Sequence, residues 1–233
     1  MGMVGHSLGS YESLLFTDRH RADVVGMVLI DPSFPDQSVR LKRAAPAIYA
    51  LAPPTDQNPL VALFSRCATA LRAGTIVRGG VDPDGCLRPP PPPKSYPVEL
   101  RNALIRQANE PDLGKVARTM DTLSSSLRSV DQSSRMIVSP GRNYGNMPLI
   151  VLTATTFLWP PNTSAEAKAE LPARQAMWRQ GHDELAALSS QGVNRIVADS
   201  GHFIQQDQPQ AVIDAIDEVL KHSREHQAAP TRR

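Results

Sequence analysis

The residues at positions 5–9, Gly-His-Ser-Leu-Gly, form the pattern G-x-S-x-G, in which a serine hydroxyl can act as a nucleophile. Glycines suit both flanks of the serine because the backbone bends sharply there from a strand into a helix, and a Cβ would crowd the adjoining segments. Residues 3–4 are apolar, and residues 11–15 carry apolar side chains at roughly helical spacing. We therefore expect Ser7 to project from such a turn and to act as a nucleophile, the alternative being a purely structural glycine turn.

A serine hydroxyl is a poor nucleophile at neutral pH, so Ser7 needs a base and the base needs a carboxylate to orient it. His202, in the sequence SGHF, is the candidate base, and Asp31, in the sequence LIDPS, is the candidate acid. The backbone N–H of Leu8 would stabilise the oxyanion that forms during attack on a carbonyl. The alternatives are a hydrogen-bonded loop histidine at 202 and a simple turn residue at Asp31, which stands before Pro32. We interpret His6 as a packing and hydrogen-bonding residue.

Strand-like and helical segments alternate on both sides of a less regular middle region. Strands are predicted at residues 24–30, 147–157 and 194–200, and helices at residues 56–73, 98–108, 113–130, 164–190 and 209–220. Strands alternating with helices imply a parallel sheet with helices on both faces, and chemistry in such sheets gathers at the carboxyl ends of the strands. Ser7, Asp31 and His202 all follow strand-like segments.

The middle region contains local signals of its own. Asp56 is the predicted cap of the helix at 56–73, and prolines at 89–93 predict a stiff, extended spacer. His182 precedes two acidic residues on a charged helical stretch and is interpreted as solvated.

The composition excludes several classes of protein. The 233 residues include 25 Lys plus Arg and 23 Asp plus Glu, so no excess of charge points to nucleic acid. The longest apolar runs have strand length and fall short of a membrane span. No His, Cys and carboxylate residues have metal-ligand spacing, and we expect neither a metal nor a cofactor.

Three segments, VGHSLGS, VVGMVLIDPSFPDQ and SGHFIQQDQPQAVIDAI, resemble landmarks of the α/β-hydrolase fold in the order serine, acid, histidine. The resemblance implies an α/β fold with a mostly parallel sheet, flanking helices and a helical cap insertion. It also implies a serine esterase or lipase-like enzyme that acts on a small-molecule acyl substrate. The implied domains are a core sheet with the nucleophile turn at 1–33, the cap at 34–146, the rest of the core with the histidine at 147–222, and a flexible tail at 223–233.

The acid departs from the commonest pattern of that family. There it usually follows the strand that corresponds to PLIVLTA, but here no carboxylate occurs after that strand before Glu166. A variant in some lipases of the fold places the acid one strand earlier in an L-D-P turn, which LIDPS matches. Asp31 is thus the preferred acid, and Asp36 and Glu166 stay open as alternatives.

The two cysteines, Cys67 and Cys86, both lie in the predicted cap. Related cap-bearing hydrolases with such a pair look extracytoplasmic, so the resemblance favours a disulfide and an oxidising compartment for the parent protein, against two free thiols. A bridge across this spacing would stabilise the fold by about 3 kcal/mol. The few residues before Ser7 leave no room for a secretory signal.

In the hydrolase fold, strands and helices precede the nucleophile strand, and a loop among them supplies the second oxyanion donor. We expect this chain to lack them and to correspond to the carboxyl-terminal two thirds of a hydrolase. Two hypotheses follow. The chain is a serine hydrolase with the triad Ser7, Asp31 and His202, or it is a fragment or pseudoenzyme of that family without turnover of its own.

Overall fold

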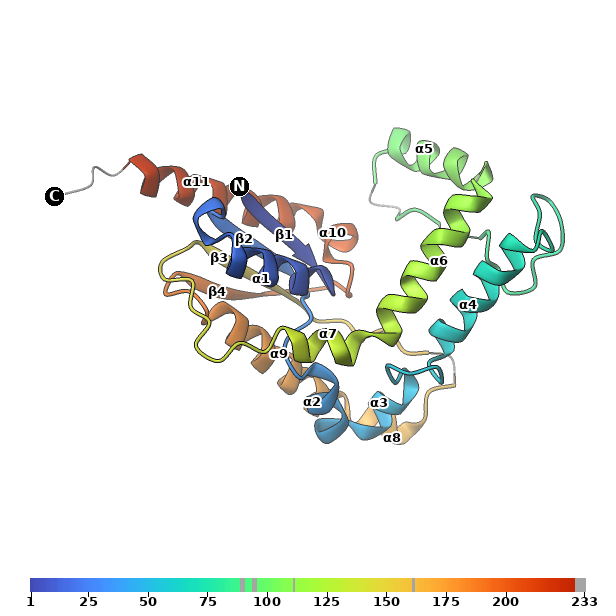
Figure 1. The fold of residues 1–233 in the computed structure, drawn as a ribbon, viewed down its shortest axis with the longest axis horizontal. Helices are drawn as coiled ribbons and strands as arrows, with labels where there is room; N and C mark the ends of the chain where they lie inside the picture. Colours follow the sequence, from blue (N-terminus) through green and yellow to red (C-terminus); the bar gives the residue numbers. More distant parts are fainter. Residues whose placement is uncertain (89–90, 94–95, 111, 161, 229–233) are drawn as a thin grey trace. The chain divides into compact units, whose positions relative to one another are not determined.

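The computed structural model describes the chain except residues 89–90, 94–95, 111, 161 and 229–233 (Figure 1). It divides into two compact units. The first combines Met1–Tyr49 with the chain from Asp131 onward, and the second runs from Ala50 to Val130. The second unit is therefore shorter than the predicted cap at 34–146.

The first unit is built on a four-stranded parallel sheet, which confirms the predicted fold class. Its strands are β1 (Gly2–His6), β2 (Gly26–Ile30), β3 (Leu149–Ala154) and β4 (Gly192–Val197), in the spatial order β1-β2-β3-β4. Every neighbouring pair is parallel. All four carboxyl ends therefore lie along the same edge of the sheet, where a site can draw on several strands.

Helices cover both faces of this sheet (Figure 1). Met27, Leu29, Leu149 and Val151 pack in one cluster with α1 (Gly9–Arg19) and α9 (Leu171–Ala186). The residues that alternate with them, Val28, Ile30, Ile150 and Leu152, pack against α11 (Pro209–Ala228). The two central strands, β2 and β3, are buried on both faces, which explains why their sequences are continuous apolar runs.

The remaining helices of the first unit are short. They are η1 (Arg21–Asp23), α2 (Gln37–Ala44), α8 (Ala165–Ala169), α10 (Ile204–Asp207), and α3 (Pro46–Leu51) and α7 (Val130–Met136), which both cross the boundary between the units. The single helix predicted over 164–190 is in fact two, α8 and α9. Pro172 lies in the first turn of α9, where its missing N–H is tolerated but cannot continue a helix from α8. Helix α11 continues to Ala228, beyond the predicted end near residue 220.

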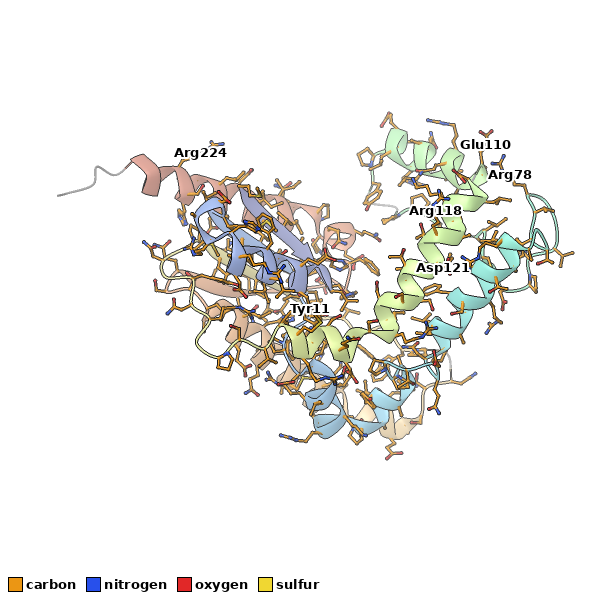
Figure 2. The ribbon with its side chains drawn as sticks, in the orientation of Figure 1. Tyr11, Arg78, Glu110, Arg118, Asp121 and Arg224 are labelled. Carbon is orange, nitrogen blue, oxygen red and sulfur yellow. A yellow bond between two sulfur atoms is a disulfide. The ribbon has the colours of Figure 1, made fainter. Side chains whose placement is uncertain are left out.

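The second unit contains α4 (Pro59–Arg72), α5 (Val98–Asn109) and α6 (Leu113–Arg128). Helix α4 packs on α6. Asp121 of α6, which Figure 2 labels, forms an ion pair with Arg72 of α4. Asn58 rather than Asp56 caps α4, because the Asn58 side chain accepts the Leu60 N–H.

A disulfide joins Cys67 of α4 to Cys86 inside a small apolar core of the second unit. The Asp82 carboxylate accepts the N–H groups of Cys86 and Leu87, so the loop that carries Cys86 is also held by hydrogen bonds. Of the predicted proline spacer at 89–93, residues 89–90 lie outside the described part of the chain.

Candidate active site

Ser7 occupies the turn between β1 and α1 in a strained backbone conformation, with φ of 54°. Its N–H donates to the Ile30 carbonyl at the end of β2, and its carbonyl accepts the Ser33 N–H at 3.0 Å. A positive φ at a non-glycine residue marks a conformation that its surroundings must enforce. The turn thus fixes Ser7 at the carboxyl edge of the sheet.

The glycine at position 5 is required by this turn. A Cβ there would come within 2.6 Å of the Ser13 Oγ and 2.8 Å of the Gly9 carbonyl oxygen. The sharp bend brings α1 back across the end of β1, and only glycine leaves enough space. A Cβ added at Gly9 would have no such contact, so crowding does not require glycine at that flank, contrary to the expectation from the sequence.

His202 lies in the loop between β4 and α10 and joins the two other predicted residues. Its Nε2 is 2.9 Å from the Ser7 Oγ, and its Nδ1 is 2.7 Å from the Asp31 Oδ2. When Nδ1 carries the ring proton, its N–H donates a hydrogen bond to the carboxylate, and the unprotonated Nε2 can accept the serine proton. The three residues come from the ends of three different strands.

Asp31 is buried and held from several sides. Its Oδ1 accepts the indole N–H of Trp178 at 3.1 Å and the backbone N–H of Ala154 at 3.2 Å. Burial works against its ionisation, but the hydrogen bonds from His202 and the Ala154 N–H, with the charges of His182 and His202, outweigh it. The pKa of Asp31 is therefore lowered below its ordinary value.

The other acid candidates lie elsewhere. Asp36 is exposed at the start of α2 and Glu166 is exposed in α8, and neither carboxylate forms a hydrogen bond with His202. Asp31 therefore satisfies the geometric requirement for orienting the histidine, and the two alternatives do not. Within the described part of the chain, no acceptor takes the Leu8 N–H, which leaves that donor free.

His6 supports the histidine loop from the other side. Its Nε2 lies 2.8 Å from the His202 carbonyl oxygen, and the two rings lie 4.6 Å apart. Burial lowers the pKa of His6, while the hydrogen bond to the His202 carbonyl partly offsets this. A neutral His6 that donates this hydrogen bond fits the packing role expected from the sequence.

Sequence analysis missed Trp178 as a partner of the carboxylate and misplaced His182. His182 is not solvated but completely buried; its Nδ1 lies 2.6 Å from the Thr153 Oγ1, and its Nε2 donates to the Pro32 carbonyl at 2.9 Å. Residues 178 and 182 are one helical turn apart, so they share the inner face of α9. The acidic neighbours of His182 obscured this face, whereas the spacing from Trp178 could have indicated it.

Comparison with known proteins identifies the family of the chain. The sequence model of the alpha/beta hydrolase family matches residues 2–215. The chain belongs to the alpha/beta hydrolase family. No curated protein matches its sequence.

Two solved structures resemble this hydrolase-family chain at low sequence identity. MenH from S. aureus is 13% identical with a TM-score of 0.48, over 96% of this chain and 68% of that protein. A provisionally assigned acyltransferase from Salmonella enterica is 14% identical with a TM-score of 0.46, over 96% of this chain and 64% of that protein. The chain thus spans about two thirds of the length of each.

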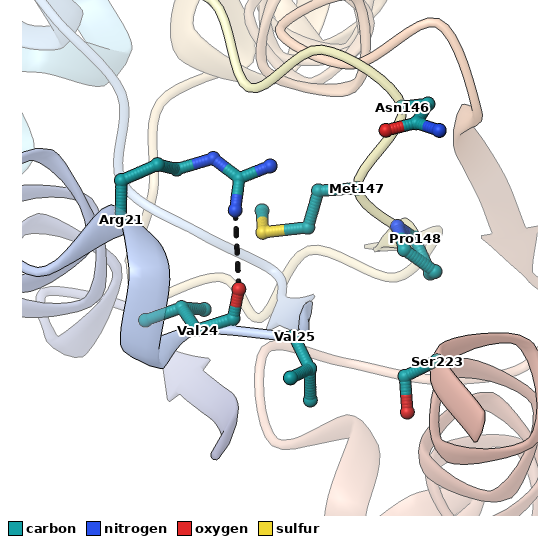
Figure 3. Close-up of a pocket in the computed structure, with 7 residues that line it drawn as sticks. All are labelled: Arg21, Val24, Val25, Asn146, Met147, Pro148 and Ser223. Atoms are coloured by element: carbon teal, nitrogen blue, oxygen red, sulfur yellow. Dashed lines mark hydrogen bonds between the residues drawn. The ribbon is translucent and has the colours of Figure 1, made fainter. Parts of the chain in front are cut away.

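Other possible sites in this hydrolase-family chain are less suited to chemistry. A pocket of about 180 Å³ is lined by residues that include Arg21, Val25 and Pro148 (Figure 3). It lies where β2 and β3 begin, whereas Ser7 lies where the strands end. The Arg21 guanidinium is already satisfied there by the carbonyls of Val24 and Tyr144.

The described residues include no group of three or more His, Cys, Asp or Glu side chains that could hold a metal ion. None of the described helices is long and apolar enough to span a membrane.

Proposed function

We propose that the chain is a serine hydrolase that cleaves a carboxylic ester or a similar acyl substrate through Ser7, His202 and Asp31. The observation that carries this proposal is the continuous pair of hydrogen bonds from the Asp31 Oδ2 through the His202 ring to the Ser7 Oγ, at 2.7 and 2.9 Å. Both distances lie within the range expected of a nucleophile and its base.

In this mechanism the His202 Nε2 accepts the Ser7 proton as the Oγ attacks the carbonyl carbon. The tetrahedral intermediate carries a negative oxygen, to which the free Leu8 N–H donates. The intermediate collapses when Nε2 returns the proton to the leaving alcohol, and Ser7 is then acylated. A water molecule repeats the sequence with the same base and releases the acid.

Asp31 remains ionised throughout these steps. Because its pKa is lowered, the carboxylate is available near neutral pH to stabilise the imidazolium formed on His202. The hydrogen bonds from Trp178 and the Ala154 N–H fix the carboxylate so that Oδ2 faces the Nδ1. No metal or cofactor takes part in the proposed reaction.

Labelling with an uncharged fluorophosphonate tests the proposal, because this reagent reacts with an activated serine. We expect the 233-residue chain to be labelled at Ser7, and labelling to disappear in Ser7→Ala. The matched control is Ser125→Ala, which changes an exposed serine of α6 in the second unit and should label normally. Absence of labelling in a folded chain would contradict the proposal and favour the hypothesis of a family member without turnover.

A further inference from the structure

The guanidinium of Arg174 lies between aromatic rings beside the candidate active site. Its Cζ is 4.4 Å from the centroid of the Phe157 ring and 4.6 Å from that of Trp178. Arg174 and Trp178 are one turn apart on α9, while Phe157 lies in the segment that follows β3. Two cation–π contacts hold the guanidinium plane in place and leave its N–H groups available.

Within the described residues, the Arg174 guanidinium has no carboxylate partner and no hydrogen-bond acceptor. Glu170 precedes it by one turn, but the Glu170 Oε2 instead accepts the Ile48 N–H at 3.0 Å. Burial lowers the pKa of Arg174, and the charge of Asp31 acts in the opposite direction. A half-buried guanidinium without a paired anion is costly and is suited to receive one from a ligand.

This cation lies next to the proposed triad, on the side of Asp31. The Trp178 ring that packs on Arg174 also donates its N–H to the Asp31 Oδ1. The segment that carries Phe157 is joined to the histidine loop, because the Ser200 carbonyl accepts the N–H groups of residues 155 and 156. Arg174 and His202 therefore both lie near the carboxyl ends of the strands.

We propose that Arg174 is a binding residue for a carboxylate on the substrate, so that the hydrolase acts on acyl compounds that carry a second, ionised carboxyl group. This inference rests on the proposed function of Ser7. The planar fork of a guanidinium matches a carboxylate with two parallel hydrogen bonds. A phosphate dianion fits less well, since a single cation with Asp31 nearby does not balance its charge.

Monomethyl glutarate and dimethyl glutarate form the test pair, because they differ in one ionised carboxyl group. Their affinities are measured by calorimetry in the Ser7→Ala background, which prevents turnover and separates binding from the nucleophile. We expect the charged compound to bind at least tenfold more tightly. Arg174→Gln should abolish this preference, and Arg174→Lys, which keeps the charge without the fork, should retain part of it.

The matched control is Arg179→Gln, which removes an exposed arginine from the same helix and should keep the full preference. Equal affinity for both compounds, no measurable binding of either, or a preference that persists in Arg174→Gln would overturn the proposal. Inorganic phosphate that competes as well as the monoester would overturn the assignment to a carboxylate.

If Arg174 served only to balance the charge of Asp31, its variants would change the affinities for both compounds equally and leave their ratio unchanged. Failure of fluorophosphonate labelling, by contrast, bears on Ser7 alone.

Discussion

At the scale of single residues, His182 links the candidate site to the stability of the fold. It is fully buried, and burial, partly offset by the charge of Asp31, lowers its pKa from 6.5 to about 4. Between these two values the unfolded chain binds a proton that the folded chain does not. The free energy of unfolding therefore falls as the pH drops from 6.5 towards 4, by about 3 kcal/mol for this group.

His182→Gln should remove most of this pH dependence, since glutamine keeps a donor for the Pro32 carbonyl but does not titrate. Urea unfolding at pH 7 and at pH 4.5 measures it as the difference between the parent and the variant. His222→Gln, which changes an exposed histidine on α11, serves as the control and should behave like the parent. Equal pH dependence in the parent and in His182→Gln would show that His182 is protonated in the folded state.

We expect Trp178 to act as a positioning residue for the Asp31 carboxylate, because its indole N–H donates to the Oδ1. Trp178→Phe keeps an aromatic ring beside Phe34 and Arg174 but removes the N–H that the Asp31 Oδ1 accepts. A hydrogen bond to a charged group contributes roughly 1.5–3 kcal/mol, so we expect Ser7 labelling to slow by roughly 10- to 100-fold.

The pH profile of labelling separates this role from a purely structural one. Without the indole donor the pKa of Asp31 should rise, so labelling should require a higher pH in Trp178→Phe than in the parent. Trp159→Phe is the matched control, because Trp159 packs on Phe157 and forms no hydrogen bond with Asp31. Identical profiles for the two variants would argue against the positioning role.

At the scale of secondary-structure elements, the strands and the candidate triad were predictable because their signals are local. Ser7, Asp31 and His202 stand in short patterns at the ends of strands, and the parallel sheet brings those ends to one edge. Helix α9 was less predictable because its inner face is decided by contacts with the sheet. His182 is buried on that face although two acidic residues follow it in the sequence, and its spacing of one turn from Trp178 is the one local signal of its burial.

We expect the disulfide between α4 and the following loop to stabilise the second unit. Cys67 and Cys86 are separated by 19 positions, and closing a loop of this size contributes about 3 kcal/mol. The double variant Cys67→Ala, Cys86→Ala should therefore unfold residues 50–130 more readily. Limited proteolysis with mass spectrometry should place the new cleavage sites within that range.

Reduction of the parent chain provides the matched comparison for this variant. The reduced parent and the double variant should have the same protease sensitivity, and the double variant should not respond to reductant. Thiol titration of the denatured, unreduced parent should detect no free thiol. Two titrating thiols would contradict the disulfide, and unchanged proteolysis would contradict its contribution to stability.

At the scale of the whole molecule, the sheet leaves β1 at one edge. Among the residues that the structure describes, β1 pairs only with β2. Val4 is in register with Val28 on the side of α11 and is 49% exposed. An edge strand with unpaired backbone groups and an exposed apolar side chain is a site for association between copies. We therefore expect the 233-residue chain to aggregate through this edge.

Val4→Lys should reduce that aggregation, because a charged side chain at a sheet edge opposes pairing between copies. Light scattering at increasing protein concentration measures the effect, and circular dichroism checks that the fold is kept. Val39→Lys is the matched control, since Val39 is 54% exposed on α2 and lies away from the sheet edge. If both lysine variants reduce scattering equally, net charge rather than the β1 edge governs association, and the edge hypothesis fails.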